Sequence, residues 1–271
     1  MTSILLHIHD DSGMESRLQA ACDIARATDA HIHCVQITAM PNLVAGDVYG
    51  GAAMAPSIMA ELHEIDMRMR MRLEQRLHRE GVSWNWRHAD GDIVSGLLSA
   101  SPLCDFMVVT LPGRPRRDMS DPLDLAADLA IGGRTPVLAV PDAARGVMIT
   151  GRAVVAWDGS REASAALRLG VPLLKHAGEV HVVTVEEAGK YPFPATDAPE
   201  YLCRHGIKSQ FHSWPQDGRT VEATLKAAIG VLKPDWMVMG AFGHSRWREL
   251  VFGGVTRTML RDAQVPLLLA H

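Results

Sequence analysis

The sequence has few cysteines, no long apolar run and no excess of basic residues. Its four cysteines are scattered over 271 residues without a Cys-x-x-Cys pair, which favours a reduced cytoplasmic setting. No apolar run approaches the ~18 residues of a membrane-spanning helix, and residues 1–9 lack the basic region and cleavage site of a signal peptide. The net charge of −4 gives no general basic footprint. We therefore expect a cytoplasmic protein that binds neither a membrane nor nucleic acid.

Signatures of the common catalytic sites are also missing. The chain has no Gly-x-Ser-x-Gly elbow, no Walker A lysine and no Rossmann Gly-x-Gly-x-x-Gly motif, and no evident nucleophile is paired with a base. We therefore predict no catalytic residue. Whether the protein is an enzyme stays open, and at most a very slow ATPase is expected.

What the chain does contain is an internal repeat. The segment ending in Asp158-Gly159-Ser160 matches the segment ending in Asp10-Asp11-Ser12 at an offset of 148 residues (160 − 12). Later segments match at an offset of 130 (234 − 104), so the second copy has lost 18 residues (148 − 130). Such a repeat indicates two copies of one structural unit. The other matched segments are 30–37 with 178–185, 104–109 with 234–239, and 136–140 with 266–270.

Each copy alternates short apolar segments with amphipathic ones, a pattern typical of parallel βαβ units. It predicts an α/β fold, with two tandem copies of a five-stranded doubly wound parallel-sheet domain. The first domain is expected at residues 1–142 and the second at 151–271. Strands are predicted at 3–9, 31–37, 82–87, 105–110, 136–140, 153–157, 179–185, 207–213, 235–239 and 266–270. Helices are predicted at 14–28, 57–80, 91–100, 121–132, 160–176, 196–205, 218–232 and 253–263.

A glycine-rich stretch follows the fourth predicted strand of the second copy. The apolar run that ends at Met239 is followed by Gly240 and Gly243, and after nine more residues by Gly253 and Gly254, where a helix is predicted. Glycine lets backbone N–H groups approach an anion closely, and a helix start adds unpaired N–H groups and the positive end of the helix dipole. This order favours a phosphate cradle, although the same glycines could serve only to shape a turn.

The spacing Gly-x-x-Gly, nine residues, Gly resembles the nucleotide loop of the universal stress protein family. The resemblance covers nearly the whole chain as a tandem pair of universal stress domains, and it implies an adenine nucleotide (ATP, ADP or AMP, with Mg²⁺ as an optional companion) bound in the second copy. One departure is Gly254, where the family's ATP-binding pattern carries Ser or Thr; the nearest downstream hydroxyl is that of Thr256. The residues implied to bind the nucleotide are Asp158, Val185, Gly240, Gly243, His244, Ser245, Gly253, Gly254, Val255 and Thr256.

Two residues of the second copy have competing roles. In open α/β sheets, ligands bind beyond the carboxyl ends of the strands, where the strand order reverses. Asp158 stands where the family's aspartate contacts the nucleoside, and Ser160 opens the next helix, so either could cap that helix. Capping is preferred for Ser160, and both roles stay open for Asp158. The segment around Val185 resembles the family's backbone that pairs with adenine.

The first copy departs from the pattern at the same place, so we predict that it has lost the site and that nucleotide binds once per chain. Gly113 matches Gly243, but Thr110, Leu123 and Asp124 stand where the second copy has Gly240, Gly253 and Gly254.

Two pairs of histidines are candidate metal ligands. His7-x-His9 and His31-x-His33 each put two imidazoles on one face of a strand, and the predicted fold places those strands side by side. Clustered imidazoles can bind zinc, whereas buried neutral histidines can also satisfy one another. We expect no bound metal. If zinc were bound, these four histidines would be its candidate ligands.

The second predicted helix interleaves methionines with arginines. Its residues Leu62, Ile65, Met69 and Leu73 share one face, which we predict to be the core side, with Met67 and the arginines at the periphery.

The last strand of each copy is short and apolar, and such a strand would invite aggregation if its edge were exposed. The universal stress family commonly pairs these strands between two subunits. Because both copies lie on one chain here, we predict an intramolecular pseudo-dimer in which Leu138 and Leu268 occupy matched positions. The assembly would be a monomer with a pseudo-two-fold axis, or a homodimer.

Two functions are consistent with these observations. The first is a cytoplasmic stress-response protein that binds an adenine nucleotide in its C-terminal domain and acts through unknown protein partners. The alternative is a nucleotide-independent interaction scaffold in which both sites are inactive.

Overall fold

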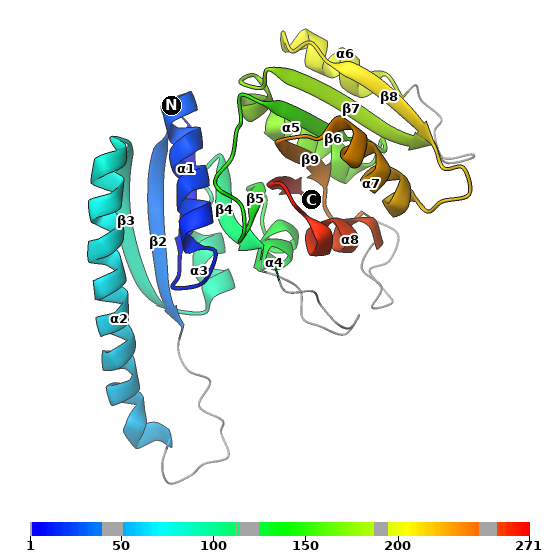
Figure 1. Ribbon diagram of the computed structural model, residues 1–271. Helices are drawn as coiled ribbons and strands as arrows, with labels where there is room; N and C mark the ends of the chain where they lie inside the picture. Colours follow the sequence, from blue (N-terminus) through cyan, green and yellow to red (C-terminus); the bar gives the residue numbers. More distant parts are fainter. Residues whose placement is uncertain (1, 40–50, 112, 114–124, 187–194, 244–253) are drawn as a thin grey trace.

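Ten strands form one continuous sheet (Figure 1). The computed structural model describes residues 2–39, 51–111, 113, 125–186, 195–243 and 254–271. The strands are β1 Ser3–Ile8, β2 His31–Ala39, β3 Ser83–Gly91, β4 Phe106–Leu111, β5 Val137–Pro141, β6 Arg152–Ala156, β7 Glu179–Glu186, β8 Gln210–Pro215, β9 Trp236–Gly240 and β10 Leu267–Ala270. Their order is β3-β2-β1-β4-β5-β10-β9-β6-β7-β8. Neighbouring strands are parallel except for β5 and β10.

Helices cover both faces of this sheet. They are α1 Met14–Thr28, α2 Gly51–Glu80, α3 Ile93–Ala100, α4 Leu125–Gly132, α5 Arg161–Leu174, α6 Asp197–Arg204, α7 Val221–Leu232 and α8 Gly254–Asp262. Buried residues of α1, α2, α5 and α6 share a core with one face, and those of α3, α4, α7 and α8 share a core with the other. In β1, Leu6 belongs to the first core and Leu5 to the second. Strands buried on both faces read as continuous apolar runs, which is why the sequence showed them.

The predicted fold class is confirmed, with two sets of five parallel strands in one doubly wound sheet. Among the strands, the predicted ends differ most from the observed ones at β3, which ends at Gly91 rather than 87, and at β8, which begins at Gln210 rather than 207. These are the two edge strands of the sheet. Their residues are half-exposed or exposed, so they lack the apolar run that marks the other strands.

β5 and β10 join the two halves of the sheet. They pair antiparallel, with Leu268 directly opposite Leu138, and both leucines are buried. The predicted intramolecular pairing is therefore confirmed. Since each strand covers the edge of the other, neither presents an unpaired edge.

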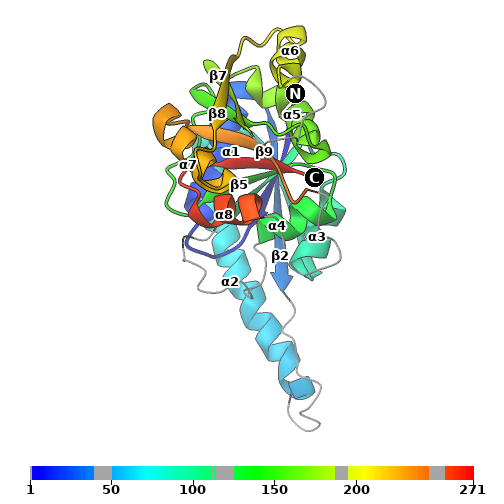
Figure 2. The same cartoon turned by 90° about the vertical axis from the view of Figure 1, so that its right-hand side faces the viewer.

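The helix α2 extends beyond the rest of the fold (Figure 2). Its Met69, Leu73 and Leu77 are buried against the core. The prediction that Ile65 faces the core is wrong, because 41% of its surface is exposed, and Leu62 is only half-buried. A single helical period cannot show where a long helix runs past the sheet that it covers.

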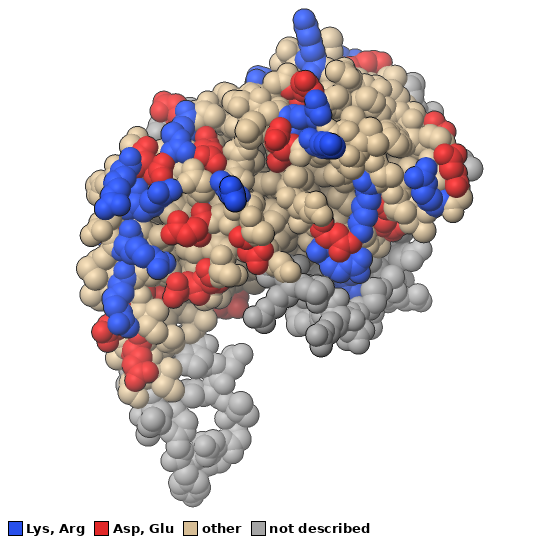
Figure 3. Space-filling view, in the orientation of Figure 1, with Lys and Arg blue, Asp and Glu red and all other residues tan. Residues whose placement is uncertain are grey.

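Charged side chains of both signs are interspersed on the face seen in Figure 3, and arginines gather along α2. This face therefore presents no continuous basic surface. Among the helices of the described residues, none combines the length and the apolar character needed to span a bilayer.

Candidate functional site

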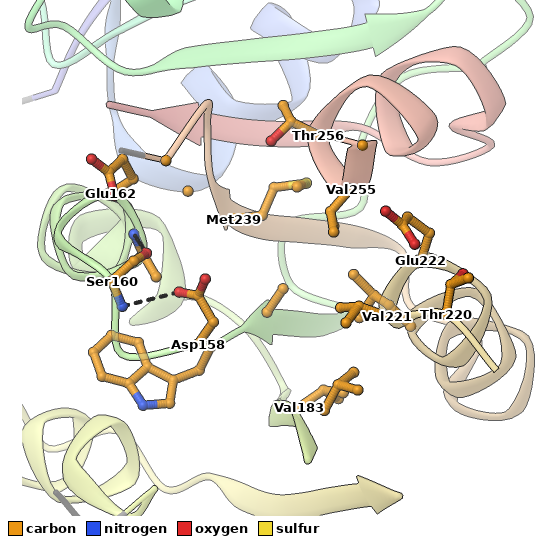
Figure 4. A pocket seen from close by; sticks show the side chains of 18 of the residues that line it. Asp158, Ser160, Glu162, Val183, Thr220, Val221, Glu222, Met239, Val255 and Thr256 are labelled. Carbon is orange, nitrogen blue, oxygen red and sulfur yellow. Dashed lines mark hydrogen bonds between the residues drawn. The ribbon is translucent and has the colours of Figure 1, made fainter. Parts of the chain in front are cut away.

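A pocket of about 650 Å³ lies at the carboxyl ends of β6, β7 and β9. It occupies the point where the strand order of the second half reverses, between β6 and β9. Figure 4 shows Asp158 and Ser160 on one side of it and Thr220 and Glu222 on the other. The lining residues are Ala156, Trp157, Asp158, Ser160, Glu162, Ala163, Val183, Val185, Gln216, Thr220, Val221, Glu222, Leu225, Met239, Gly240, Gly243, Gly254, Val255 and Thr256.

The structure brings seven of the ten predicted site residues together in this pocket. They come from four separate parts of the chain: Asp158, Val185, Gly240 with Gly243, and the run from Gly254 to Thr256. The remaining three, His244, Ser245 and Gly253, lie outside the described residues.

Asp158 and Ser160 together organise the start of α5. The Asp158 carboxylate accepts a hydrogen bond from the Ser160 backbone N–H at 3.0 Å. The Ser160 hydroxyl accepts from the Ala163 N–H at 3.1 Å, so the predicted capping role of Ser160 is confirmed. A carboxylate has two acceptor oxygens, so the bond from Ser160 leaves room for Asp158 to contact a ligand as well.

The floor of the pocket is apolar. Val183 and Val185 contribute from β7, and Val221 and Leu225 from α7. Pairing of β7 with β6 ends at Val183, opposite Ala156, so Val185 extends past the end of its neighbouring strand. A flat apolar group can therefore lie here beside the backbone of β7.

Two of the glycines serve different purposes. A Cβ on Gly240 would lie 2.5 Å from the backbone nitrogen of Ala163, so this glycine is required for α5 to approach β9. Among the atoms of the described residues, a Cβ on Gly243 would come nearest to the Glu162 carboxylate, at 3.5 Å, which is an ordinary contact. Packing within the described part of the chain therefore explains Gly240 but not Gly243.

Two carboxylates that the sequence analysis missed lie beside the glycines. Glu162 is buried in the first turn of α5, and Glu222 lies in the first turn of α7. A Cβ on Gly254 would lie 2.6 Å from the nearer carboxylate oxygen of Glu222. Each glutamate follows a capping hydroxyl by two residues, that of Ser160 or Thr220, and this spacing was the available sequence signal.

The electrostatics of the pocket combine opposing contributions. The N-termini of α5, α7 and α8 all meet there, and each helix start favours negative charge. Glu162, Glu222 and Asp158 place carboxylates at the same place. The pocket can therefore attract an anion through backbone N–H groups, but the carboxylates limit how much negative charge it tolerates.

Thr256 is directed away from the pocket centre, whereas its neighbour Val255 points into it (Figure 4). The Thr256 hydroxyl accepts a hydrogen bond from the Phe242 N–H at 3.3 Å and is buried. This bond fixes the backbone at Phe242, after the end of β9.

Comparison with solved structures identifies the architecture. A universal stress protein from Archaeoglobus fulgidus has a TM-score of 0.78 with 18% identity, covering 99% of this chain and 97% of its own. The chain has the fold of a tandem universal stress protein. A putative universal stress protein from Pseudomonas aeruginosa UCBPP-PA14 (TM-score 0.62, 16% identity) and a functionally unknown protein from P. aeruginosa PAO1 (0.62, 17%) each cover 99% of this chain and 92% of their own. No family model matches the sequence, and no curated protein matches it.

In the first of the two five-stranded units, Arg17 occupies the corresponding strand ends. Its guanidinium is fully buried and donates to the carbonyl oxygens of His7 at 2.7 Å and His9 at 2.6 Å. It also donates to the Asp11 carboxylate and to the Thr110 hydroxyl, both at 2.6 Å. This side chain lies where the strand order of the first unit reverses, between β1 and β4, and adds a physical reason for the predicted loss of a site there.

The strand pairing corrects the predicted alignment of the two units. Ile4 pairs with Phe106 and Ala153 with Trp236, so β1 and β6 are offset by 149 residues (153 − 4). The following helices begin 147 residues apart (161 − 14). The first loop is therefore two residues longer (149 − 147). Counted back from the helix, Asp11 rather than Asp10 stands at the position of Asp158 (158 − 147), and its carboxylate likewise accepts a hydrogen bond from the N–H two residues on, that of Gly13 at 2.8 Å.

The four zinc candidates are not brought together, because the strand register separates them. Ser3 pairs with His31 and Leu5 with His33, whereas His7 lies opposite Val35, nearer the other end of the strands. His33 bonds Asn85 and Ser3, each at 2.9 Å. Burial, and then the charges of Arg17 and His9, lower the pKa of His7 well below its usual value, so its imidazole is neutral at pH 7.

Proposed function

We propose that the pocket binds an adenine nucleotide, with or without Mg²⁺, and that the protein acts through partner proteins in a cytoplasmic stress response. The proposal divides the chain into a first domain, residues 1–142, without nucleotide, and a second domain, residues 151–271, with it. The observation that carries it is the convergence of seven residues, chosen from sequence alone, on one pocket at the switch point of the sheet.

The lining suggests how each part of a nucleotide would be held. The apolar floor of Val183, Val185 and Val221 suits the flat face of a base. Asp158 can accept hydrogen bonds from ribose hydroxyls. The backbone at Gly243 and at the start of α8 would receive the phosphate, since helix N-termini favour anions.

The carboxylates of the pocket suggest that it discriminates only weakly between nucleotides with different numbers of phosphates. Glu222 lies against Gly254, where the family's hydroxyl would be, and Glu162 lies beside Gly243. Each added phosphate brings negative charge toward these groups, while Gly254 offers no hydroxyl to offset the repulsion. A bound Mg²⁺ would offset part of it. We therefore expect affinities for ATP and AMP that differ by less than about tenfold, the step that one charged hydrogen bond supplies.

A matched pair of substitutions on α7 tests the proposal. Val221 lines the pocket, whereas Val231 on the same helix is 66% exposed. Val221→Phe should fill the apolar floor and weaken ATP and AMP alike by about tenfold or more, a loss of about 1.4 kcal/mol or more. Val231→Phe should bind as the wild type does. Calorimetry on both variants and the wild type measures this, with one site expected per chain.

The scaffold alternative makes the opposite prediction. The carboxylates of Glu162 and Glu222 beside the predicted phosphate position favour it. If the wild type binds neither ATP nor AMP, with or without Mg²⁺, the nucleotide proposal fails and the tandem fold serves as an interaction surface. Binding that Val221→Phe leaves unchanged would place the nucleotide elsewhere on the molecule.

A further inference from the structure

A second cluster of polar side chains lies between α2 and the edge strand β3, far from the pocket along the sheet order. α2 contributes His63 and Asp66, three residues apart and so on one side of the helix. β3 contributes His88 and Asp90, two residues apart and so on one face of the strand. The helix and the strand thus each contribute one histidine and one aspartate to the same cluster.

The atoms of this cluster converge closely. The Nε2 atom of His63 lies 2.8 Å from an oxygen of Asp90, and Nε2 of His88 lies 3.7 Å from the same oxygen. An Asp66 oxygen lies 4.0 Å from Nε2 of His88. The Thr38 hydroxyl on β2 hydrogen-bonds both Asp66 and Nε2 of His88, the latter at 2.7 Å. One small volume therefore holds two imidazole nitrogens and two carboxylates.

We propose that His63, His88 and Asp90 bind one divalent transition-metal ion, Zn²⁺ being the best fit, with Asp66 beside it as a fourth ligand or as the partner of a bound water. The ligand atoms of the three residues all lie within 4.8 Å of one another. Zinc bonds of about 2.0 Å place tetrahedral ligand atoms about 3.3 Å apart, and the observed separations of 2.8 and 3.7 Å bracket that value.

The chemistry of the donors selects the metal. Two imidazoles with carboxylates suit zinc and its neighbours, whereas Mg²⁺ and Ca²⁺ take oxygen ligands. The side chains of His63, His88 and Asp90 are partly exposed, so an ion can enter from solvent without unfolding of the helix.

The site differs from the histidine pairs rejected above. Those pairs lie on adjacent strands whose register keeps them apart. Here one histidine and one aspartate come from the helix α2 and the others from the strand β3, and a hydrogen bond between His63 and Asp90 joins the two elements. A bound ion would tie α2 to the edge strand β3. It depends on no residue of the nucleotide pocket, so the two proposals can fail separately.

The competing explanation is a network of hydrogen bonds and ion pairs without metal. In that case a proton shared between His63 and Asp90 stands where the ion would be. The full chain, freed of any affinity tag and stripped with a chelator, should be titrated with Zn²⁺ by calorimetry and with Co²⁺ by visible absorption. We expect one equivalent per chain, with Co²⁺ bands of a nitrogen and oxygen site.

His63→Gln and His88→Gln should each weaken Zn²⁺ binding by about tenfold or more. His176→Gln, at an exposed histidine beyond α5, is the matched control and should bind as the wild type does. Asp90→Asn provides a third test in case a histidine variant shows an altered circular dichroism spectrum. The proposal is overturned if the wild type shows no saturable equivalent, if the site variants bind normally, or if His176→Gln loses binding equally.

Discussion

At the scale of single residues, the two halves place glycine on opposite sides of the same contact. In the second half, Gly240 ends β9, and a Cβ there would lie 2.5 Å from the nitrogen of Ala163 on α5. In the first half the matching strand residue is Thr110 (240 − 130), and the glycine is Gly13 before α1, where a Cβ would lie 2.2 Å from Thr110. One glycine per contact lets the helix approach. Gly240 is therefore weaker evidence for a ligand than Gly243.

The buried guanidinium of Arg17 carries the residue-scale prediction. Arg17→Met should lower the free energy of unfolding by about 3 kcal/mol, because each buried acceptor left without a donor costs about 1–3 kcal/mol. Urea unfolding of the full chain measures this. Arg26→Met on the same helix is the control, since Arg26 is partly exposed and such surface ion pairs contribute about 1 kcal/mol or less. Equal losses from the two changes would show that the Arg17 network matters no more than a surface pair.

The position of the glycines between a strand and a helix could be predicted from the sequence, but the environment of Arg17 could not. Gly240, Gly243 and Gly254 follow a strand and precede a helix, so their order is local information. Arg17 is buried because groups from β1, the next loop and β4 converge on it. Glu222 meets Gly254 only because α7 and α8 lie side by side. The residues next to Arg17 and Glu222 in the sequence therefore do not show which distant groups these side chains contact.

At the scale of elements, the hydrophobic period located the strands and helices and failed where an element leaves the core. The period placed Leu62, Ile65, Met69 and Leu73 on one face of α2, and only Met69 and Leu73 of these are buried. The register of strand pairing was a second feature that the sequence could not predict. The sequence placed β1 beside β2, but nothing in it fixed His33 opposite Leu5 rather than opposite His7.

The element-scale prediction compares two positions of α2. Leu73→Ala should lower the free energy of unfolding by about 2–5 kcal/mol, as expected for a large-to-small change at a fully buried site. Ile65→Ala should have a much smaller effect, about 0.5 kcal/mol, because 41% of Ile65 is exposed. Chemical denaturation of both variants and the wild type measures these changes in the free energy of unfolding. Comparable losses would mean that the projecting part of α2 packs against something in solution.

At the scale of the whole molecule, the antiparallel pairing of β5 with β10 makes one sheet from two repeats. It moves the free edges to β3 and β8, whose exposed and polar residues suit an edge. The proposed nucleotide pocket lies between β6 and β9, and the proposed metal cluster lies at the β3 edge. Six strands lie between β3 and β6 in the sheet order, so a signal between the sites would have to cross the seam.

The seam between the halves gives the last prediction. Leu138 and Leu268 face each other across it, both are buried, and α5 packs closely enough that a Cβ on Gly170 would lie 3.4 Å from Leu268. Leu268→Asp would bury a carboxylate among apolar groups, at a cost of several kcal/mol, and Leu138→Asp should act in the same way. Since the residues 142–151 are held between two docked halves, either change should speed their cleavage in limited proteolysis. Leu169→Asp on α5, where 42% of the leucine is exposed, should leave the cleavage rate as it is in the wild type. If the seam variants are cleaved no faster than this control, contacts other than the β5–β10 pairing hold the halves together.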